Sequence, residues 1–181
     1  MSNIFVGLLL IFLDFDLNVG SSTIGLIPDF LGGIFLMMGM KEMKTESEYF
    51  KKNEVFTLVY TIISAVIYAG NLFGLFSEVV YLGWIAGLAA TVLVILLSYN
   101  IVKGIEDMEI RMQTNLEAKS LFNFWLVIAI LNGAALLSYI IPLVVIPVAI
   151  ASFVMSILFL VKLNTSKKNY QMAKSGNSTS V

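Results

Sequence analysis

Long apolar runs, separated by short charged blocks, dominate the chain. None of them alternates apolar and polar residues with the two-residue period of a membrane barrel strand. A helix needs about 20 mostly apolar residues to cross roughly 30 Å of hydrocarbon, and only a helix or a closed barrel satisfies its backbone there. Four runs meet this requirement and predict membrane-spanning helices at 55–76, 79–102, 121–141 and 143–163.

The first forty residues contain two shorter apolar runs, 4–17 and 24–40. As helices they would be roughly 21 and 26 Å long. Pro28 suits the first turn of the second helix, where its missing N–H needs no partner, and Asp29 suits the positive end of that helix. The stretch from Asp14 to Leu26 is expected to be irregular chain at or just inside the outer surface, with its backbone covered by protein or water.

The expected fold class is therefore all-α. We expect a polytopic transmembrane helix bundle with six spans in three hairpins, the first hairpin short and irregular at its outer end. A single transmembrane domain would cover residues 1–163. Residues 164–181 are rich in Ser, Thr, Asn and Lys and predict a flexible cytoplasmic tail.

The connection after the fourth span repeats apolar residues at three- and four-residue steps, opposite a charged face. We expect it to continue as an amphipathic helix lying on its own bundle or on lipid headgroups, with partner docking as the alternative. The apolar stripe is Ile101, Ile105, Met108, Met112 and Leu116, and the charged residues are Glu106, Asp107, Glu109 and Arg111.

Composition and charge support a membrane location and set an orientation. The chain is 59% hydrophobic and 13% charged, whereas a soluble domain is nearer half apolar and a quarter charged. With six spans, all eleven basic residues fall on one face, which marks it as cytoplasmic and places both termini inside. They are Lys41, Lys44, Lys51, Lys52, Lys103, Arg111, Lys119, Lys162, Lys167, Lys168 and Lys174.

The residue types that are missing limit the chemistry. The chain has no cysteine and no histidine, so thiol nucleophiles, imidazole bases and the usual nitrogen and sulfur metal ligands are excluded. A net charge of −1 without a basic cluster argues against a nucleic-acid partner. We expect no enzyme activity and no cofactor, and assign no metal site.

Three carboxylates near the first outer turn are the main candidates for a polar site: Asp14, Asp16 and Asp29. Carboxylates beside hydrocarbon are costly and often functional. In extended chain, Asp14, Asp16 and Asn18 would face the same way. An EF-hand is rejected, because its sixth and twelfth positions hold valine and glycine here instead of glycine and glutamate. A structural role is favoured, with a cation or proton site as the alternative.

Asn71 and Asn132 are polar residues well inside spans. A hydrogen bond to a neighbouring helix is the favoured role for each, and lining a substrate path is the alternative. Pro147 is expected to kink the sixth span.

Two small-residue motifs flank the short outer turn after the third span. They allow close backbone approach, either between the third and fourth spans or across a dimer. The motifs are Gly70-x-x-x-Gly74 and Gly83-x-x-x-Gly87.

The first hairpin also carries a resemblance. Leu13-Asp-Phe-Asp-Leu-Asn-Val-Gly20 is followed by Ile24-Gly-Leu-Ile-Pro-Asp-Phe-Leu-Gly32 and then by Gly39-Met-Lys-Glu42. This resembles a group of small multi-pass proteins of anaerobic Gram-positive bacteria, in which an Asn-x-Gly turn precedes Leu/Ile-Pro-Asp-Phe. It covers roughly the first fifty residues. The resemblance implies a bacterial inner membrane and this hairpin, and it implies no activity.

Function is therefore predicted only in outline. The favoured interpretation is an integral membrane protein that acts through helix packing, in contact with the lipid bilayer and with a second copy or another membrane protein as partner. The alternative is a small transporter or channel component whose acidic outer hairpin admits a cation or proton. A membrane enzyme ranks third, because the usual catalytic residue types are missing.

Overall fold

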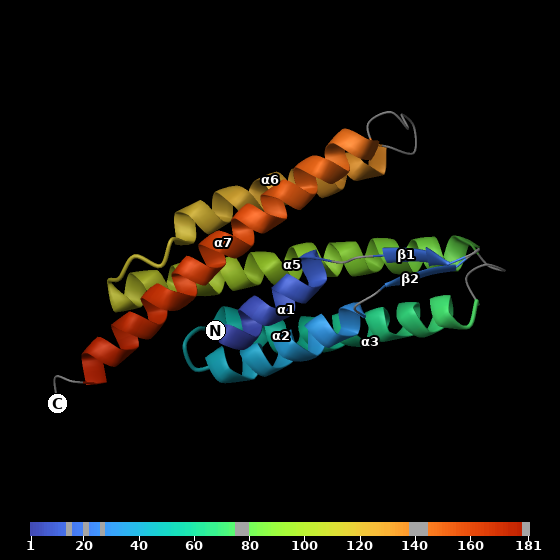
Figure 1. Ribbon diagram of the computed structural model, residues 1–181. Coiled ribbons are helices and arrows are strands. Elements are labelled where there is room, and N and C mark those ends of the chain that lie inside the picture. Colours follow the sequence, from blue (N-terminus) through green and yellow to red (C-terminus); the bar gives the residue numbers. More distant parts are fainter. Residues whose placement is uncertain (14–15, 20–21, 26–27, 75–79, 138–144, 179–181) are drawn as a thin grey trace. The chain divides into compact units, whose positions relative to one another are not determined.

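The computed structural model describes residues 1–13, 16–19, 22–25, 28–74, 80–137 and 145–178 (Figure 1). Within these ranges the chain is mainly helical, with one short two-stranded antiparallel sheet. The elements are α1 (Ser2–Phe12), β1 (Asp16–Val19), β2 (Ser22–Gly25), α2 (Asp29–Met43), α3 (Glu48–Leu72), α5 (Val80–Met112), α6 (Ala118–Leu137) and α7 (Val145–Ser178).

Three helices in the described residues, rather than six, are long and apolar enough to cross a membrane. They lie in α3, α5 and α7, at Glu48–Leu72, Ile85–Met112 and Ile146–Ser175. Ser2–Phe12 and Ala118–Ala134 are shorter apolar helices. The predicted helical class is thus confirmed, and six complete spans remain a prediction.

Residues 1–97 form one compact unit, in which α2 packs against both α1 and α3. Glycines on α2 set its distance to its two neighbours. A Cβ atom added at Gly39 would lie 2.7 Å from the backbone nitrogen of Ile4, and one added at Gly33 would lie 3.1 Å from the Cβ of Thr61. No side chain fits at these glycines without movement, so the helix backbones approach closely, as small residues permit in membrane bundles.

The ends of the helices in this unit are held by local contacts. The amide of Asn3 donates to the Glu42 carboxylate over 2.5 Å, which joins the start of α1 to the end of α2. Ser47 caps α3 by accepting from the backbone N–H of Tyr49. At the other end of α2, Pro28 is the N-cap and Asp29 stands in the first turn. The start predicted for this helix from Pro28 is confirmed to within two residues.

Residues 98–181 form a second compact unit, in which α6 packs along α7. Residues 98–112 of α5 belong to this unit and carry most of the predicted amphipathic stripe. Ile101, Ile105 and Met108 are buried, as is Leu116 just beyond the helix. This confirms that the stripe lies on the chain's own fold.

Apolar side chains cover the outward faces of the long helices. Val55, Ile62 and Val66 on α3 are exposed, as are Ile85 and Val92 on α5 and Ile146, Ile150 and Val161 on α7. The buried side of α3 holds polar residues instead, which reverses the pattern of a helix on a soluble protein. This arrangement is compatible with helices that face lipid.

Two expectations about regular structure are wrong. Residues 164–178 were expected in a flexible tail, but they continue α7, whose buried positions Phe159, Leu163, Ser166 and Tyr170 recur at helical spacing. The stretch expected to be irregular contains β1 and β2, paired in the register Asp16↔Gly25 and Asn18↔Thr23. Backbone pairing within the hairpin satisfies groups that an irregular loop would leave open.

Pro147 lies at the described start of α7, as the third residue of Val145–Ser178. The residues that precede Val145 lie outside the described ranges, so the kink expected at Pro147 stays a prediction.

Candidate functional site

The outer hairpin places two of the predicted site residues on one face. Asp16 and Asn18 are two residues apart in the extended strand β1, and Asn18 pairs with Thr23 of β2. Residues two apart in a strand share a face. Asp29 stands apart, in the first turn of α2. Asp14 lies outside the described residues.

No metal centre is defined by the part of the chain that the structure describes. Within it, no three Asp, Glu, His or Cys residues gather closely enough to hold an ion. The cation or proton site at Asp14, Asp16, Asn18 and Asp29 therefore stays a prediction.

A buried polar stripe runs along α3 and is the main polar feature of residues 1–97. Asn53, Thr57, Tyr60 and Ser64 are all buried, at spacings of four, three and four residues. None of them is among the site residues expected from the sequence. Their helical spacing within an apolar run is the signal that identifies them.

The Thr57 and Ser64 hydroxyls of this stripe, and that of the neighbouring Thr61, bond to their own helix. Thr57 donates to the carbonyl of Asn53 over 2.7 Å, Thr61 donates to that of Thr57 over 2.7 Å, and Ser64 donates to that of Tyr60 over 2.9 Å. Hydroxyls bonded to the preceding turn need no ligand or neighbouring helix. The stripe thus serves close packing better than it would serve as a row of ligand donors.

Asn53 is the member of the stripe that connects helices. Its side chain is 0% exposed, and its amide donates to the Leu97 carbonyl of α5 over 3.0 Å and to the Met40 sulfur of α2 over 3.7 Å. An amide buried among three helices fixes their relative position, because leaving its polar atoms unpaired is costly. This is the interhelical role that the sequence had assigned to other asparagines.

The asparagines and glycines singled out from the sequence lie in different settings. Asn132 donates to the Ile128 carbonyl of its own helix over 2.9 Å, so this bond is not the expected interhelical one. Asn71 is half-buried near the end of α3. Gly70 is buried, whereas Gly74, with a φ of 69°, ends α3 in the left-handed region that favours glycine.

Gly87 of the second glycine motif has no close neighbour at its Cβ position among the described residues, and packing of α3 on α5 through this motif stays a prediction. No described atom lies within 4 Å of a Cβ built at Gly87, and the surroundings of Gly83 lie outside what the structure describes. The motif had been placed by its spacing alone, and spacing does not reveal which face of a helix is covered. A role for Gly87 across a dimer remains a prediction.

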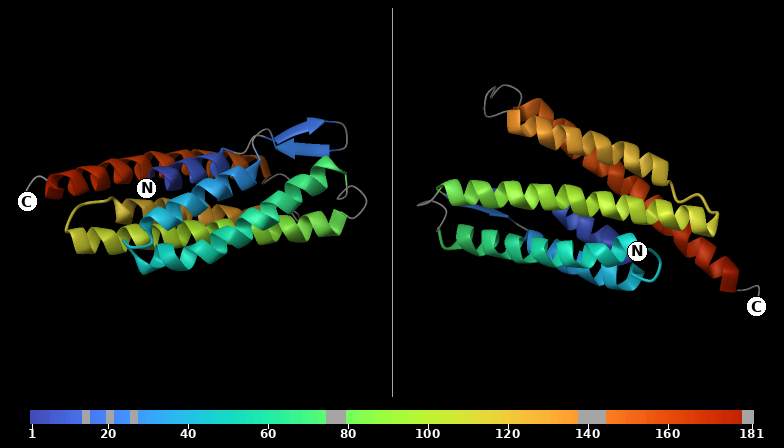
Figure 2. Two further views of the ribbon diagram at one scale, coloured as in Figure 1. Left: turned by 90° about the horizontal axis from the view of Figure 1, so that it is seen from below. Right: turned by 180° about the vertical axis from the view of Figure 1, so that it is seen from behind.

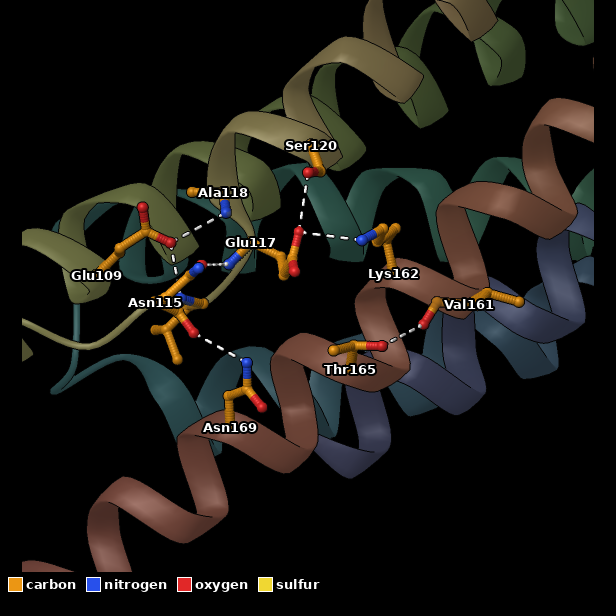
Figure 3. Close-up of polar contacts among 10 residues, drawn as sticks. Glu109, Asn115, Glu117, Ala118, Ser120, Val161, Lys162, Thr165 and Asn169 are labelled. Carbon is orange, nitrogen blue, oxygen red and sulfur yellow. Dashed lines mark hydrogen bonds and ion pairs between the residues drawn. The ribbon is translucent and has the colours of Figure 1, made fainter.

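A second polar cluster lies where the α5–α6 connection meets α7, within residues 98–181 (Figure 3). The carboxylate of Glu109 accepts from the backbone N–H groups of Leu116 over 2.7 Å and Ala118 over 3.1 Å. It thereby covers the start of α6, where N–H groups lack partners and the helix dipole favours negative charge. Glu109 had been expected only on the solvent face of α5.

Glu117 joins this connection to α7. Its Oε2 accepts from the Ser120 hydroxyl over 2.8 Å and from the Lys162 amine over 3.1 Å. The Ser120 hydrogen bond and then the Lys162 hydrogen bond hold the pKa of Glu117 below its ordinary value. Burial opposes them, and the charge of Lys162 lowers the pKa further. Asn169 adds a second tie, donating to the Asn115 carbonyl over 2.9 Å.

The connection itself is tightly turned. Gln113 and Glu117 have φ angles of 49° and 63°, which non-glycine residues seldom adopt. Asn115 supports the turn, because its side-chain oxygen accepts from the Glu117 backbone N–H over 2.9 Å. The polar ties to α6 and α7 thus hold a strained turn in one shape.

Aromatic rings and a lysine gather near this end of α5 and α6. The Tyr99 and Trp125 rings lie 4.9 Å apart, and Phe122 lies 5.6 Å from Trp125. Lys103 lies 5.4 Å above the Phe122 ring and pairs with Glu106. Trp, Tyr and Lys are typical of membrane–water boundaries.

Comparison with known proteins finds no family model, no curated protein and no solved structure that matches the chain.

Proposed function

We propose that this chain is a multi-pass integral membrane protein that acts through helix packing and contacts with membrane partners. One observation carries the proposal: α3, α5 and α7 expose apolar side chains outward, while α3 buries its polar stripe. Lipid solvates an apolar surface at no cost, whereas water would not. The six-span topology belongs to the proposal, with α1, α2 and α6 as the shorter members.

The distribution of basic residues supports an orientation within this proposal. Every Lys and Arg lies in one of three stretches: 41–52 around the α2–α3 connection, 103–119 from the last third of α5 to the start of α6, or 162–174 in the second half of α7. Under the positive-inside rule these segments are cytoplasmic, with both termini inside a bacterial plasma membrane. The resemblance of the first hairpin to a group of bacterial multi-pass proteins agrees with this membrane.

Topology reporters test the proposal. Fluorescent-protein and alkaline-phosphatase fusions at Lys44, at Arg111 and at the C-terminus should all give the cytoplasmic signal. A phosphatase signal from Lys44 or Arg111 would overturn the six-span arrangement. Release of the protein from membranes by alkaline carbonate would overturn integral insertion itself.

The packing role is favoured over transport by the way the polar groups are bonded. The hydroxyls of Thr57, Thr61 and Ser64 bond their own helix, and Asn53 bonds neighbouring helices. A substrate path would need donors and acceptors that remain open to a ligand. The alternative, a transporter component with cation or proton entry at Asp16 and Asn18, is supported by their shared face on β1.

A further inference from the structure

The helical parts of the first two proposed spans are shorter than the hydrocarbon of a bilayer is thick, so α1 and α2 need further chain to complete the crossing. α1 has 11 residues and α2 has 15, which correspond to roughly 16 and 22 Å against about 30 Å of hydrocarbon. The 25 residues of α3 span roughly 37 Å. α1 and α2 therefore do not cover the whole length of α3.

The contacts between α2 and α3 show where α2 stops. The two helices are joined by a short turn at 44–47, and Gly33 lies against Thr61. Asp29, the first residue of α2, is four residues before Gly33, and so is level with about residue 65 of the antiparallel α3. α3 then continues to Leu72, about 10 Å further.

The β1–β2 hairpin lies at this level. β2 contacts α3, and Figures 1 and 2 show the hairpin continuing past the ends of α1 and α2 along α3. The outward side of α3 stays apolar over the same turns, since Val66 and Leu72 are 58% and 53% exposed. The last two turns of α3 thus expose apolar side chains on one side, as lipid contact requires, while β2 packs against α3 on another side.

A two-stranded hairpin beside the last turns of a membrane-spanning α3 cannot be surrounded by lipid alone. Each strand pairs only one edge and leaves alternate N–H and C=O groups open on the other. Lipid satisfies none of them, so non-helical backbone at membrane depth persists only where protein or water covers it. The register groups Asp16, Asn18 and Thr23 on one face of the hairpin, and these residue types favour water over protein cover.

We propose that β1 and β2 form a re-entrant hairpin in a water-filled recess that opens from the non-cytoplasmic side, beside the last two turns of α3. This inference rests on the proposed membrane insertion. In this arrangement the β1–β2 hairpin has a defined role. The hairpin places Asp16, Asn18 and Thr23 in water below the outer surface of the membrane.

Nitroxide labels at single cysteines test the recess, because the native chain has no cysteine. We would make Asn18→Cys, Thr23→Cys, Val66→Cys and Leu72→Cys, label each protein and reconstitute it in liposomes. Collision rates are then compared for oxygen, which concentrates in hydrocarbon, and for a water-soluble nickel chelate. Nickel should dominate at residues 18 and 23, and oxygen should dominate at 66 and 72, with oxygen-to-nickel ratios several-fold apart.

Each other outcome has a definite meaning. Nickel dominance at all four sites would place the hairpin above the bilayer, and oxygen dominance at all four would make it dry; either result overturns the recess. A Val154→Cys label on the exposed face of α7 separates this failure from that of the proposed function. If Val154 also reports water, membrane insertion itself is wrong.

Hydrogen exchange of the unmodified protein covers the case in which labelled variants misfold. In liposomes, peptides over 16–25 should exchange quickly and peptides over 62–72 slowly. Slow exchange throughout 16–25 would overturn the recess.

Discussion

Gly7 of α1 and Gly32 of α2 meet backbone to backbone. A Cβ added at Gly7 would lie 2.8 Å from the Gly32 carbonyl oxygen, and one added at Gly32 would lie 2.9 Å from the Gly7 carbonyl oxygen. Each glycine leaves room for the main chain of the other helix. Because both obstacles are backbone atoms, a side-chain rotation cannot relieve them.

Gly7→Ala should therefore separate α1 from α2 and destabilise the protein by about 1–3 kcal/mol, the usual cost of overpacking. Gly87→Ala is the matched control, because no described atom stands near that position and alanine favours a helix by up to about 1 kcal/mol over glycine. Thermal unfolding in detergent measures both. Equal midpoints for the two variants would contradict close α1–α2 packing.

Asn53→Leu should lower stability by about 0.6–2 kcal/mol, because the hydrogen bond from α3 to the Leu97 carbonyl is lost. Thr57→Val is the control: it is similar in shape and removes only a bond within α3, so it should change stability little. Denaturant titration in mild detergent measures the difference. A larger loss in Thr57→Val than in Asn53→Leu would contradict the assigned interhelical role.

The Glu117–Lys162 pair should give a pH-dependent contribution to stability. Because the pKa of Glu117 is lowered in the folded state, its contribution is complete above the ordinary value of 4.5 and is lost as the pH falls through the lowered pKa. Glu117→Gln should cost about 1 kcal/mol or less at neutral pH, since both side chains are partly solvated, and nothing at a pH below the lowered pKa.

Thermal midpoints of wild type and Glu117→Gln across this pH range measure the effect. Glu48→Gln is the control, because the Glu48–Lys51 pair is well exposed and should contribute little. A wild-type advantage that stays constant down to the lowest pH would show that Glu117 acts through its shape and not its charge.

Deleting residues 164–181 should destabilise the protein by about 2 kcal/mol or more, because Tyr170 is buried and Asn169 holds the Asn115 carbonyl. Deleting only 179–181 is the control and should have little effect. Circular dichroism melting of both truncations in detergent makes the comparison. Identical melting would restore the view that this segment is a tail.

The sequence predicts the helices well where length and apolarity decide. The runs around α3, α5 and α7 form helices long and apolar enough to cross a membrane, and Pro28 marks the start of α2. The stripe from Ile101 to Leu116 is predicted for a similar reason: its period is visible without knowing what covers it.

The sequence-based predictions are wrong, or miss a contact, where the role of a residue depends on which other segment of the chain packs against it. The packing role of Gly7 and Gly32 appears only when α1 and α2 are placed together, whereas no described atom lies within 4 Å of a Cβ built at Gly87. The end of α7 buries serine and tyrosine where a typical helix would bury leucine. Local composition cannot reveal such contacts, because they depend on chain distant in sequence.

The central claim is that lipid covers the outward faces of α3, α5 and α7. An apolar diazirine dissolved in the bilayer, activated by light and followed by peptide mass spectrometry, tests it directly. The account predicts carbene insertion at exposed Val66 and Ile150 and none at buried Tyr60 and Phe159. Insertion at Val66 and Ile150 from a water-soluble diazirine, with none from the apolar one, would contradict it.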